Sequence, residues 1–289
     1  MDILCLDIGG TSTRAAIVCK NGIKNKIVKK TPFSKKDEMV NQSVTLVKEL
    51  FNINSIKAIS IGCAGPVMKS IMQGSEPMGI TDNVNFKNEI NKFFKIPVYV
   101  ENDLQMAIRA ERKYGFGKGI KNFVIVSLST GIGVAVLKNN MIMEGRIEIG
   151  HNIIDNNKKF YISSSIGNSG SWVSQASGSA IKSYLEKNEE NTSIESFFKK
   201  PDKDFLNHIV EINSHGFAQI IHAYDPEIII IMGSLGINQF EKIIPKSSNI
   251  KKKCLLRPIP NIIKSRLGDD VGILGAYEFA LEKLVNFNA

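Results

Sequence analysis

The chain has 289 residues, which allow one large or two medium domains with an ample core, and its 43% hydrophobic and 22% charged residues are typical of a globular protein. A net charge of +9 would suit a nucleic-acid partner. However, the lysines are dispersed and the densest runs, 20–36 and 251–253, lack aromatic residues at stacking intervals, so we expect no such partner. No apolar run approaches the ~20 residues that span a bilayer, which excludes a membrane-embedded protein.

The first predicted elements are two buried strands that flank a tight glycine turn, over residues 2–18. Gly9 and Gly10 allow positive φ and a close approach of the backbone to a ligand. Thr11 and Thr13 place hydroxyls beside the turn, as in a phosphate cradle, and Asp7 ends the first strand where a carboxylate can hold Mg²⁺. An ordinary hairpin with a capping acid explains the same pattern, so both interpretations stay open at this point.

The rest of the first half alternates strands and helices. We expect strands at 22–30, 56–63 and 97–100, helices at 36–51, 86–94 and 104–114, and a loop over 67–85. The second of these strands ends in a glycine-rich loop, 62–66, which is either a structural turn or a binding loop. The third ends in Glu101, Asn102 and Asp103. Asp103 is therefore either a helix N-cap or a general base at a strand end.

The second half repeats the opening plan. A strand at 122–128, a turn with Thr130 and Gly131, and a returning strand at 134–137 form a second strand–turn–strand unit. Two such units are more specific than one and suit a nucleotide held by two domains. The remaining elements are helices at 172–185 and 205–224, a buried strand at 227–232, a glycine turn at 233–236 and a C-terminal helix opened by 267–276.

Cysteine usage and the amino terminus both favour the cytoplasm. Cys5, Cys19, Cys63 and Cys254 show no CxxC spacing, and three of them lie inside apolar runs, so we expect buried free thiols. Met1 leads straight into an apolar run without a basic leader, so we expect no secretory signal.

With these elements in order, the sequence resembles the ROK family of sugar kinases, within the actin-like and Hsp70-like ATPase fold. The matching segments are DIGGTSTR (7–14), GCAGPV (62–67), VENDLQMA (100–107), LSTGIGVAVL (128–137), EIGH (148–151), ASGSAI (176–181), DPEIIIIMGSLG (225–236) and RLGDDVGILGA (266–276). The resemblance implies two actin-like (ribonuclease H-like) α/β domains with mixed sheets around a central cleft. The expected domains are 1–117 and 118–271, with helix 272–289 packing back on the first. The resemblance also implies a homodimer.

The resemblance further implies an ATP-dependent kinase that transfers the γ-phosphate of Mg-ATP to a hydroxyl, the 6-OH, of a hexose such as glucose. The implied nucleotide residues are Asp7 (with Mg²⁺), Gly9, Gly10, Thr11, Thr13, Thr130, Gly131, Gly233 and Ser234. The implied sugar residues are Gly65, Asn102, Glu148 and His151, with Asp103 as the catalytic base. An N-acetylmannosamine or other N-acylhexosamine, or a sugar acid, remains an alternative acceptor.

The sequence departs from the family pattern in two places. The family's zinc motif has three cysteines where this chain has Ser164, Ile166 and Ser171, so we expect no structural zinc. A sugar-binding Glu is replaced by Val173, and an Asn expected in the 73–81 loop is lost, because the nearest residues there are Glu76 and Pro77. Such changes can redirect the choice of sugar.

Three rival interpretations follow. A ROK repressor would carry a winged helix-turn-helix ahead of the core, and the first strand here begins at Asp2. A catalytically inactive sugar sensor would explain the two lost contacts, although Asp7, Asp103 and Thr130 are all present. Another branch of the ATPase fold, such as acetate kinase or a BadF-type kinase, is disfavoured by the EIGH segment.

Overall fold

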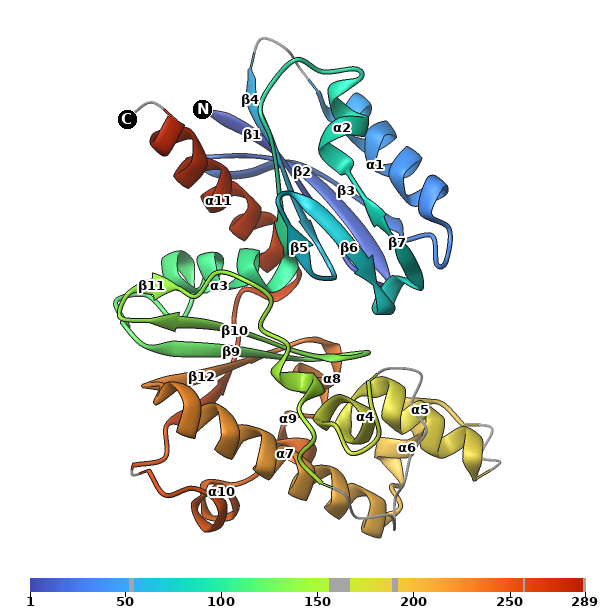
Figure 1. Ribbon diagram of the computed structural model, residues 1–289, viewed down its shortest axis with the longest axis vertical. Helices are drawn as coiled ribbons and strands as arrows, with labels where there is room; N and C mark the ends of the chain where they lie inside the picture. Colours follow the sequence, from blue (N-terminus) through green and yellow to red (C-terminus); the bar gives the residue numbers. More distant parts are fainter. Residues whose placement is uncertain (52–54, 156–166, 189–191, 257, 288–289) are drawn as a thin grey trace. The chain divides into compact units, whose positions relative to one another are not determined.

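The computed structural model describes residues 1–51, 55–155, 167–188, 192–256 and 258–287. Contacts divide the chain into two compact units. The first holds Met1–Lys118, Glu144–Arg146 and Leu267–Ala289, and the second holds Gly119–Met143 and Ile147–Arg266. Each unit contains a five-stranded mixed sheet with helices packed on it (Figure 1). The predicted α/β class with mixed sheets is therefore confirmed.

The sheet of the first unit has the strand order β3-β2-β1-β4-β8. Its strands are β1 (Asp2–Ile8), β2 (Ser12–Cys19), β3 (Gly22–Lys30), β4 (Ile56–Cys63) and β8 (Val98–Asn102). Strand β1 is antiparallel to β2 and parallel to β4, which is parallel to β8. Both faces of β1 are covered: Leu4 and Leu6 join one apolar cluster, and Ile3 and Cys5 join another. This explains why the strand is an uninterrupted apolar run rather than an alternating one.

The segment expected to be a loop, 67–85, is instead a small antiparallel sheet, and that prediction is wrong. It contains β5 (Val67–Met68), β6 (Ile71–Ser75), the 3₁₀ helix η1 (Glu76–Met78) and β7 (Ile80–Val84). The β5–β6 turn uses Lys69 and Ser70, both at positive φ (51° and 63°), in place of the Asn or Gly that usually marks such a turn. Gly74 and Gly79, which indicated a loop, have positive φ (84° and 66°) within β6 and at the end of η1.

Helices cover the first sheet. They are α1 (Lys36–Leu50), α2 (Phe86–Asn91), α3 (Asp103–Tyr114) and the C-terminal α11 (Val271–Phe287). Helix α11 lies against α3, where Arg109 Nε donates to Glu282 Oε2 at 2.8 Å and the Tyr114 hydroxyl donates to Glu278. Arg109 is only 5% exposed and also lies over the ring of Phe279 at 4.7 Å. The last helix of the chain is therefore part of the first unit.

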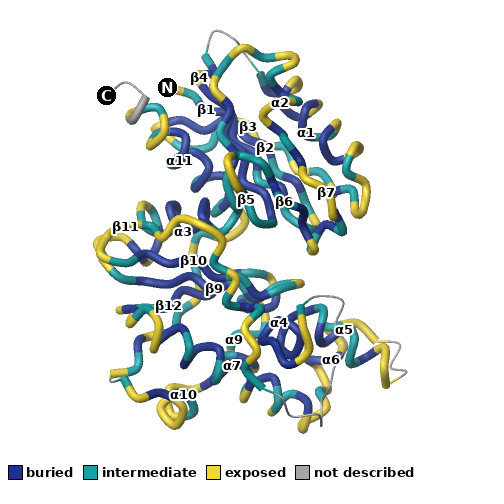
Figure 2. The backbone as a smooth tube through the Cα atoms, viewed as in Figure 1, coloured by how far each residue is buried: buried dark blue, intermediate teal, exposed yellow. Residues whose placement is uncertain are grey.

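The second unit follows the same plan, with the strand order β11-β10-β9-β12-β13. Its strands are β9 (Phe123–Leu128), β10 (Ile132–Lys138), β11 (Met141–Ile142), β12 (Ile228–Met232) and β13 (Asn261–Lys264). Again an antiparallel hairpin, β9–β10, is followed by a parallel neighbour, β12, and a further parallel strand, β13. Figure 2 shows the central strands of both sheets buried along most of their length.

The second unit contains more helices than the sequence indicated. They are the 3₁₀ helix η2 (Ile149–His151), α4 (Trp172–Ala176), α5 (Gly178–Lys187), α6 (Ile194–Lys199), α7 (Lys203–Tyr224), α8 (Ser234–Asn238), α9 (Phe240–Ile243) and α10 (Ser247–Lys253). The single helix predicted over 172–185 is two helices. Ser177 interrupts it with an extended backbone (ψ 170°), and its side chain caps α5 by accepting a hydrogen bond from Ala180 N.

All four cysteines are buried, as the sequence predicted. Within the described parts of the chain, no helix is both long and apolar enough to cross a membrane.

Gly275 sets the distance between α11 and α3, because a Cβ at this position would overlap the carbonyl oxygen of Met106. We expect Gly275→Ala to lower the free energy of unfolding by about 2 kcal/mol, the usual cost of overpacking a core. Urea denaturation measures this effect. Thr45→Ala, on the exposed side of α1, is the matched control and should change stability by less than about 0.5 kcal/mol. Equal effects of the two substitutions would contradict the close packing.

Candidate functional site

The first glycine turn lies between β1 and β2. The Gly9 amide donates to the Ser12 carbonyl at 3.1 Å, which closes the turn. A Cβ on Gly10 would lie 2.9 Å from the carbonyl oxygen of Pro77 in η1, so only glycine fits between the turn and η1. Thr11 is exposed at the tip. The turn therefore offers a backbone and a hydroxyl to solvent on one side and is packed on the other.

Thr13 lies beneath this turn and not on its exposed side. Its side chain is fully buried, and its hydroxyl lies 2.9 Å from that of Thr31, which donates to the Gly9 carbonyl at 2.7 Å. Because a hydroxyl has one proton to donate, Thr13 must be the donor to Thr31. We therefore interpret Thr13 as a support of the turn. Thr31, which the sequence analysis missed, is the second member of this support; a Thr directly after Lys29 and Lys30 was its only sequence signal.

Asp7 is the penultimate residue of β1 and is almost enclosed, with 14% of its side chain exposed. Arg14 Nη1 lies 3.6 Å from Asp7 Oδ2, and Arg14 Nη2 lies 3.5 Å from Asp269 Oδ1. Burial raises the pKa of Asp7 from its ordinary 3.8 to about 6; Arg14 opposes this shift and Asp269 adds to it. A Cβ on Gly272, in the first turn of α11, would lie 2.6 Å from both carboxylate oxygens.

The donor set around Asp7 fits Mg²⁺ held jointly with a nucleotide. Asp7 supplies one carboxylate, and no group of three or more His, Cys, Asp or Glu in the described residues could hold a metal alone. Mg²⁺ is commonly bound by one or two carboxylates together with substrate phosphates and water.

Asn102 and Asp103 lie where β8 meets α3. Asn102, not Asp103, caps the helix: its Oδ1 accepts from Leu104 N at 2.9 Å and from Gln105 N at 3.2 Å. Its Nδ2 donates to the Gly65 carbonyl at 3.0 Å, so one amide proton remains for a ligand. Asp103 is the first residue of α3, and its Oδ1 accepts from Leu104 N at 2.9 Å. The capping explanation for Asp103 is therefore wrong.

The register of the parallel strands brings the first group of predicted residues to one sheet edge. Asp7 pairs with Gly62 on β4, and Gly62 pairs with Glu101 on β8. Asp103 directly follows β8, and the Gly65 loop directly follows β4. Asp7, Gly65, Asn102 and Asp103 consequently share the carboxyl edge of the first sheet, which is the edge where open α/β sheets bind ligands.

The second turn, between β9 and β10, is fastened by α5. Ser129 N donates to Gly131 O at 2.9 Å, Gly178 N to Ser129 O at 2.8 Å, and Ser179 N to Thr130 O at 3.1 Å. Two amides at the start of α5 therefore hold the turn carbonyls. A Cβ on Gly178, the first residue of α5, would lie 2.9 Å from Ser129 O, so glycine lets the start of this helix approach the turn closely.

Gly233 and Ser234 lie at the same edge of the second sheet as this turn, because Met232 pairs with Ser127 on β9. The predicted glycine turn at 233–236 is in fact the start of α8. Gly233 has φ 81° and would place a Cβ 2.9 Å from Ser127 Oγ. Thr130 and Ser234 are exposed, so the edge presents two hydroxyls beside a helix start.

Glu148 is the N-cap of η2 and His151 is its last residue, and His151 N donates to Glu148 O at 2.9 Å. Glu148 Oε2 and His151 Nε2 are 4.0 Å apart, and 46% and 36% of these side chains are exposed. Gly150, between them, is buried and packs so closely on Ile132 that a Cβ would overlap the Ile132 carbonyl oxygen. Strand β10 therefore anchors this segment and leaves both polar side chains accessible.

The positions that depart from the family pattern are accounted for in different ways. Val173 is 1% exposed and belongs to the apolar core of the second unit. Ser171 is fully buried and caps α4 by accepting from Ser174 N at 3.3 Å. Glu76 and Pro77 form η1. Ser164 and Ile166 lie outside the described residues.

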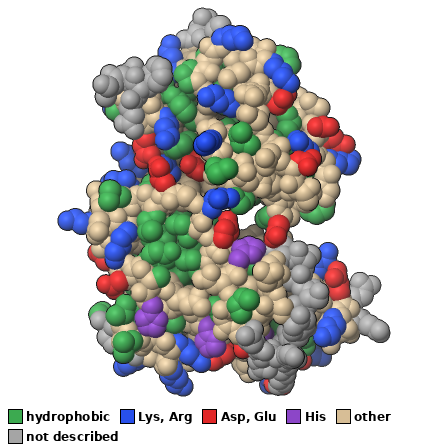
Figure 3. Space-filling view, viewed as in Figure 1, with side chains coloured by type: hydrophobic (Ala, Val, Ile, Leu, Met, Phe, Trp, Pro, Cys, Tyr) green, Lys and Arg blue, Asp and Glu red, His purple; other side chains and the backbone are tan. Residues whose placement is uncertain are grey.

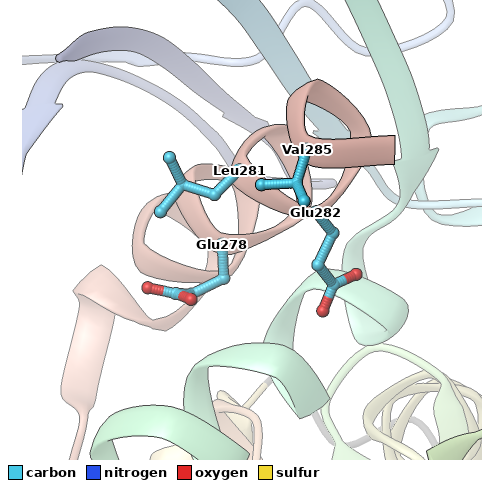
Figure 4. Close-up of a pocket in the computed structure, with 4 residues that line it drawn as sticks. All are labelled: Glu278, Leu281, Glu282 and Val285. Atoms are coloured by element: carbon cyan, nitrogen blue, oxygen red, sulfur yellow. The ribbon is translucent and has the colours of Figure 1, made fainter. Parts of the chain in front are cut away.

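Two surface features carry no predicted site residue. In Figure 3, Lys and Arg side chains are scattered among acidic ones and do not gather into one patch. A depression of about 420 Å³ on α11 is lined by Glu278, Leu281, Glu282 and Val285 (Figure 4). Its two carboxylates accept the hydrogen bonds from α3 described above.

Comparison with known sequences gives a consistent result. The ROK family profile matches residues 3–283. A glucokinase from Thermotoga maritima is 24% identical over 98% of this chain and 98% of its own length. An N-acetylmannosamine kinase from Haemophilus influenzae is 25% identical over 99% and 97%. A xylose repressor from Bacillus spizizenii is 26% identical over 71% of this chain and 56% of the repressor.

Solved structures show the same fold. A ROK hexokinase from Thermus thermophilus has a TM-score of 0.80 at 20% identity and covers 99% of this chain and 100% of its own. A ROK glucokinase from Streptomyces griseus, solved with glucose and AMPPNP, has a TM-score of 0.75 at 21% identity over 96% and 99%. The predicted actin-like ATPase fold class is confirmed by these neighbours.

The raised pKa of Asp7 predicts that the stability of the folded protein depends on pH. Because the folded protein holds this proton up to about pH 6 and the unfolded chain only to about pH 3.8, stability falls as pH rises from 4 to 6. Relative to Asp7→Asn, which does not titrate, the wild type should lose on the order of 2–3 kcal/mol across this window. Urea denaturation at pH 4, 5, 6 and 7 tests this. A difference that does not vary with pH would contradict it.

Asn102 makes two separable contributions. Asn102→Ala removes the cap and the bond to Gly65 and should cost about 1–2 kcal/mol of unfolding free energy. Asn102→Ser keeps a capping oxygen and loses the amide donor to Gly65, so it should cost less. If urea denaturation gave equal losses for both, the cap would not be the main contribution.

Proposed function

This chain belongs to the ROK family, and from that premise we propose that it is an ATP-dependent sugar kinase. The observation that carries the proposal is the group at the carboxyl edge of the first sheet. There a carboxylate, Asp103, follows the Asn102 cap directly, and the strand register brings Asp7 to the same edge.

Asp103 is the proposed general base. As the acceptor hydroxyl oxygen bonds to the γ-phosphorus of ATP, the bond from that phosphorus to the β,γ-bridging oxygen breaks, and the hydroxyl proton passes to Asp103. Position at the start of α3 favours the ionised carboxylate that this role needs. Asn102 is oriented by its cap and its bond to Gly65, so its remaining amide proton is fixed in direction.

The two turns are the proposed phosphate contacts. Gly9, Gly10 and Thr11 offer the first, and the hydroxyl pair beneath them keeps it in shape. Thr130 and Gly131 offer the second, which α5 fastens from behind. Backbone amides of such turns suit phosphate oxygens. Bound Mg²⁺ would supply charge neutralisation at the phosphates, and Asp7 is the residue proposed to hold it.

The proposed acceptor is a hexose phosphorylated at its 6-OH, with Gly65, Asn102, Glu148 and His151 as the sugar contacts. Carboxylate and imidazole groups that are partly exposed, as in Glu148 and His151, suit sugar hydroxyls. Val173 is a core residue and cannot replace a polar sugar contact. An acceptor other than glucose, either an N-acylhexosamine or a sugar acid, is therefore the next proposal.

A sugar sensor without catalysis is the second candidate function. The xylose repressor among the relatives and the apolar residue at Val173 favour it. Retention of Asp7, Asp103 and Thr130 favours the kinase.

A coupled assay of ADP release with Mg-ATP, over glucose, mannose, N-acetylglucosamine, N-acetylmannosamine and 2-keto-3-deoxygluconate, tests the proposal. We expect turnover that requires a sugar and that falls about 10²–10⁴-fold in Asp103→Asn. The melting temperature and ADP affinity of that variant should stay near wild type, because only the base is lost. Sugar binding without turnover in the wild type would support the sensor, and near wild-type turnover in Asp103→Asn would exclude this base.

A further inference from the structure

Arg14 on β2 lies between two carboxylates and is bonded closely to neither. Its two terminal nitrogens lie 3.6 Å from Asp7 and 3.5 Å from Asp269. Both distances are ion-pair contacts and exceed the 2.7–3.2 Å of an N–H···O hydrogen bond. The guanidinium, which is 19% exposed, is therefore shared between the two acids.

The two carboxylate side chains differ in how tightly they are packed and in how exposed they are. Asp7 is fixed on β1 and lies against the first turn of α11, where Gly272 leaves no room for a Cβ. Asp269 belongs to the 3₁₀ helix η4 (Gly268–Asp270), and 83% of its side chain is exposed. Asp269 is thus well hydrated and accessible, whereas Asp7 is a nearly buried anion that forms an ion pair with Arg14.

We infer that Arg14 is an exchangeable counter-ion: it neutralises Asp7 while the nucleotide is absent, and it passes to Asp269 when Mg²⁺ arrives with the nucleotide. The inference rests on the proposed function, since it requires Mg-nucleotide binding at Asp7. Two cations cannot share one nearly buried carboxylate without repulsion, and Asp269 provides the second position within reach of the same guanidinium.

Opposite effects of two substitutions follow from this arrangement. Arg14→Gln removes the competing cation, so Mg²⁺ should support nucleotide binding at a lower concentration. Asp269→Asn removes the alternative acid and leaves Arg14 on Asp7, so more Mg²⁺ should be needed. If Arg14 only braced Asp7 in position, both substitutions would loosen the carboxylate and both would raise the Mg²⁺ requirement.

The test is an Mg²⁺ titration of ADP binding, followed by calorimetry and by the ADP-dependent rise in melting temperature. We expect the half-saturating Mg²⁺ concentration to fall about fivefold in Arg14→Gln and to rise about fivefold in Asp269→Asn. Lys92→Gln is the control for loss of a positive charge, because Lys92 pairs with Glu89 on the exposed side of α2. It should leave the titration unchanged.

Shifts in the same direction for both variants, or an equal shift in Lys92→Gln, would overturn the inference and leave the proposed kinase intact. A wild type that binds ADP without any dependence on Mg²⁺ would overturn the inference and the proposed role of Asp7 together. Asp269→Asn changes an exposed side chain and keeps the test valid even if Arg14→Gln folds poorly.

Discussion

The parallel pairing of β1, β4 and β8 is the constraint on which the first candidate site depends. Parallel strands end at a common edge, so residues that are far apart in the sequence, Asp7, Gly65 and Asp103, are brought together by register alone. The second sheet repeats this geometry with β9 and β12, which places Thr130 and Gly233 at one edge. The main-chain hydrogen bonds between the strands therefore determine where each site lies, and contacts among the side chains of the site do not.

The polar groups of these edges are held by a layer beneath them. Thr13 and Thr31 support the first turn, the amides of α5 support the second, and the Gly65 carbonyl orients Asn102. Ser171 has a different structural role. It stands at a cysteine position of the zinc motif, and its hydroxyl caps α4 instead.

Much of this architecture could be predicted from the sequence. The strands and the helix of residues 2–63 were predicted, because long apolar runs and helical spacing dominate there. The motif residues also lie at the expected strand ends. The β5–β7 sheet was missed since Lys69 and Ser70 form its turn without a recognisable turn residue. The roles of Thr13 and Asn102 also depend on partners distant in sequence, Thr31 and Gly65, which no local pattern reveals.

The contribution of α11 bears on the order in which the protein can mature during synthesis. Residues 2–114 contain the strands and the helix that carry Asp7 and Asp103, yet the helix that encloses Asp7 is the last element of the chain. Until α11, which includes Gly272, has left the ribosome, the face of β1 that holds Ile3 and Cys5 lacks this helix as its cover. The nascent first unit therefore keeps an apolar surface exposed while the whole second unit is synthesised. Chaperones act on chains with such exposed apolar surface.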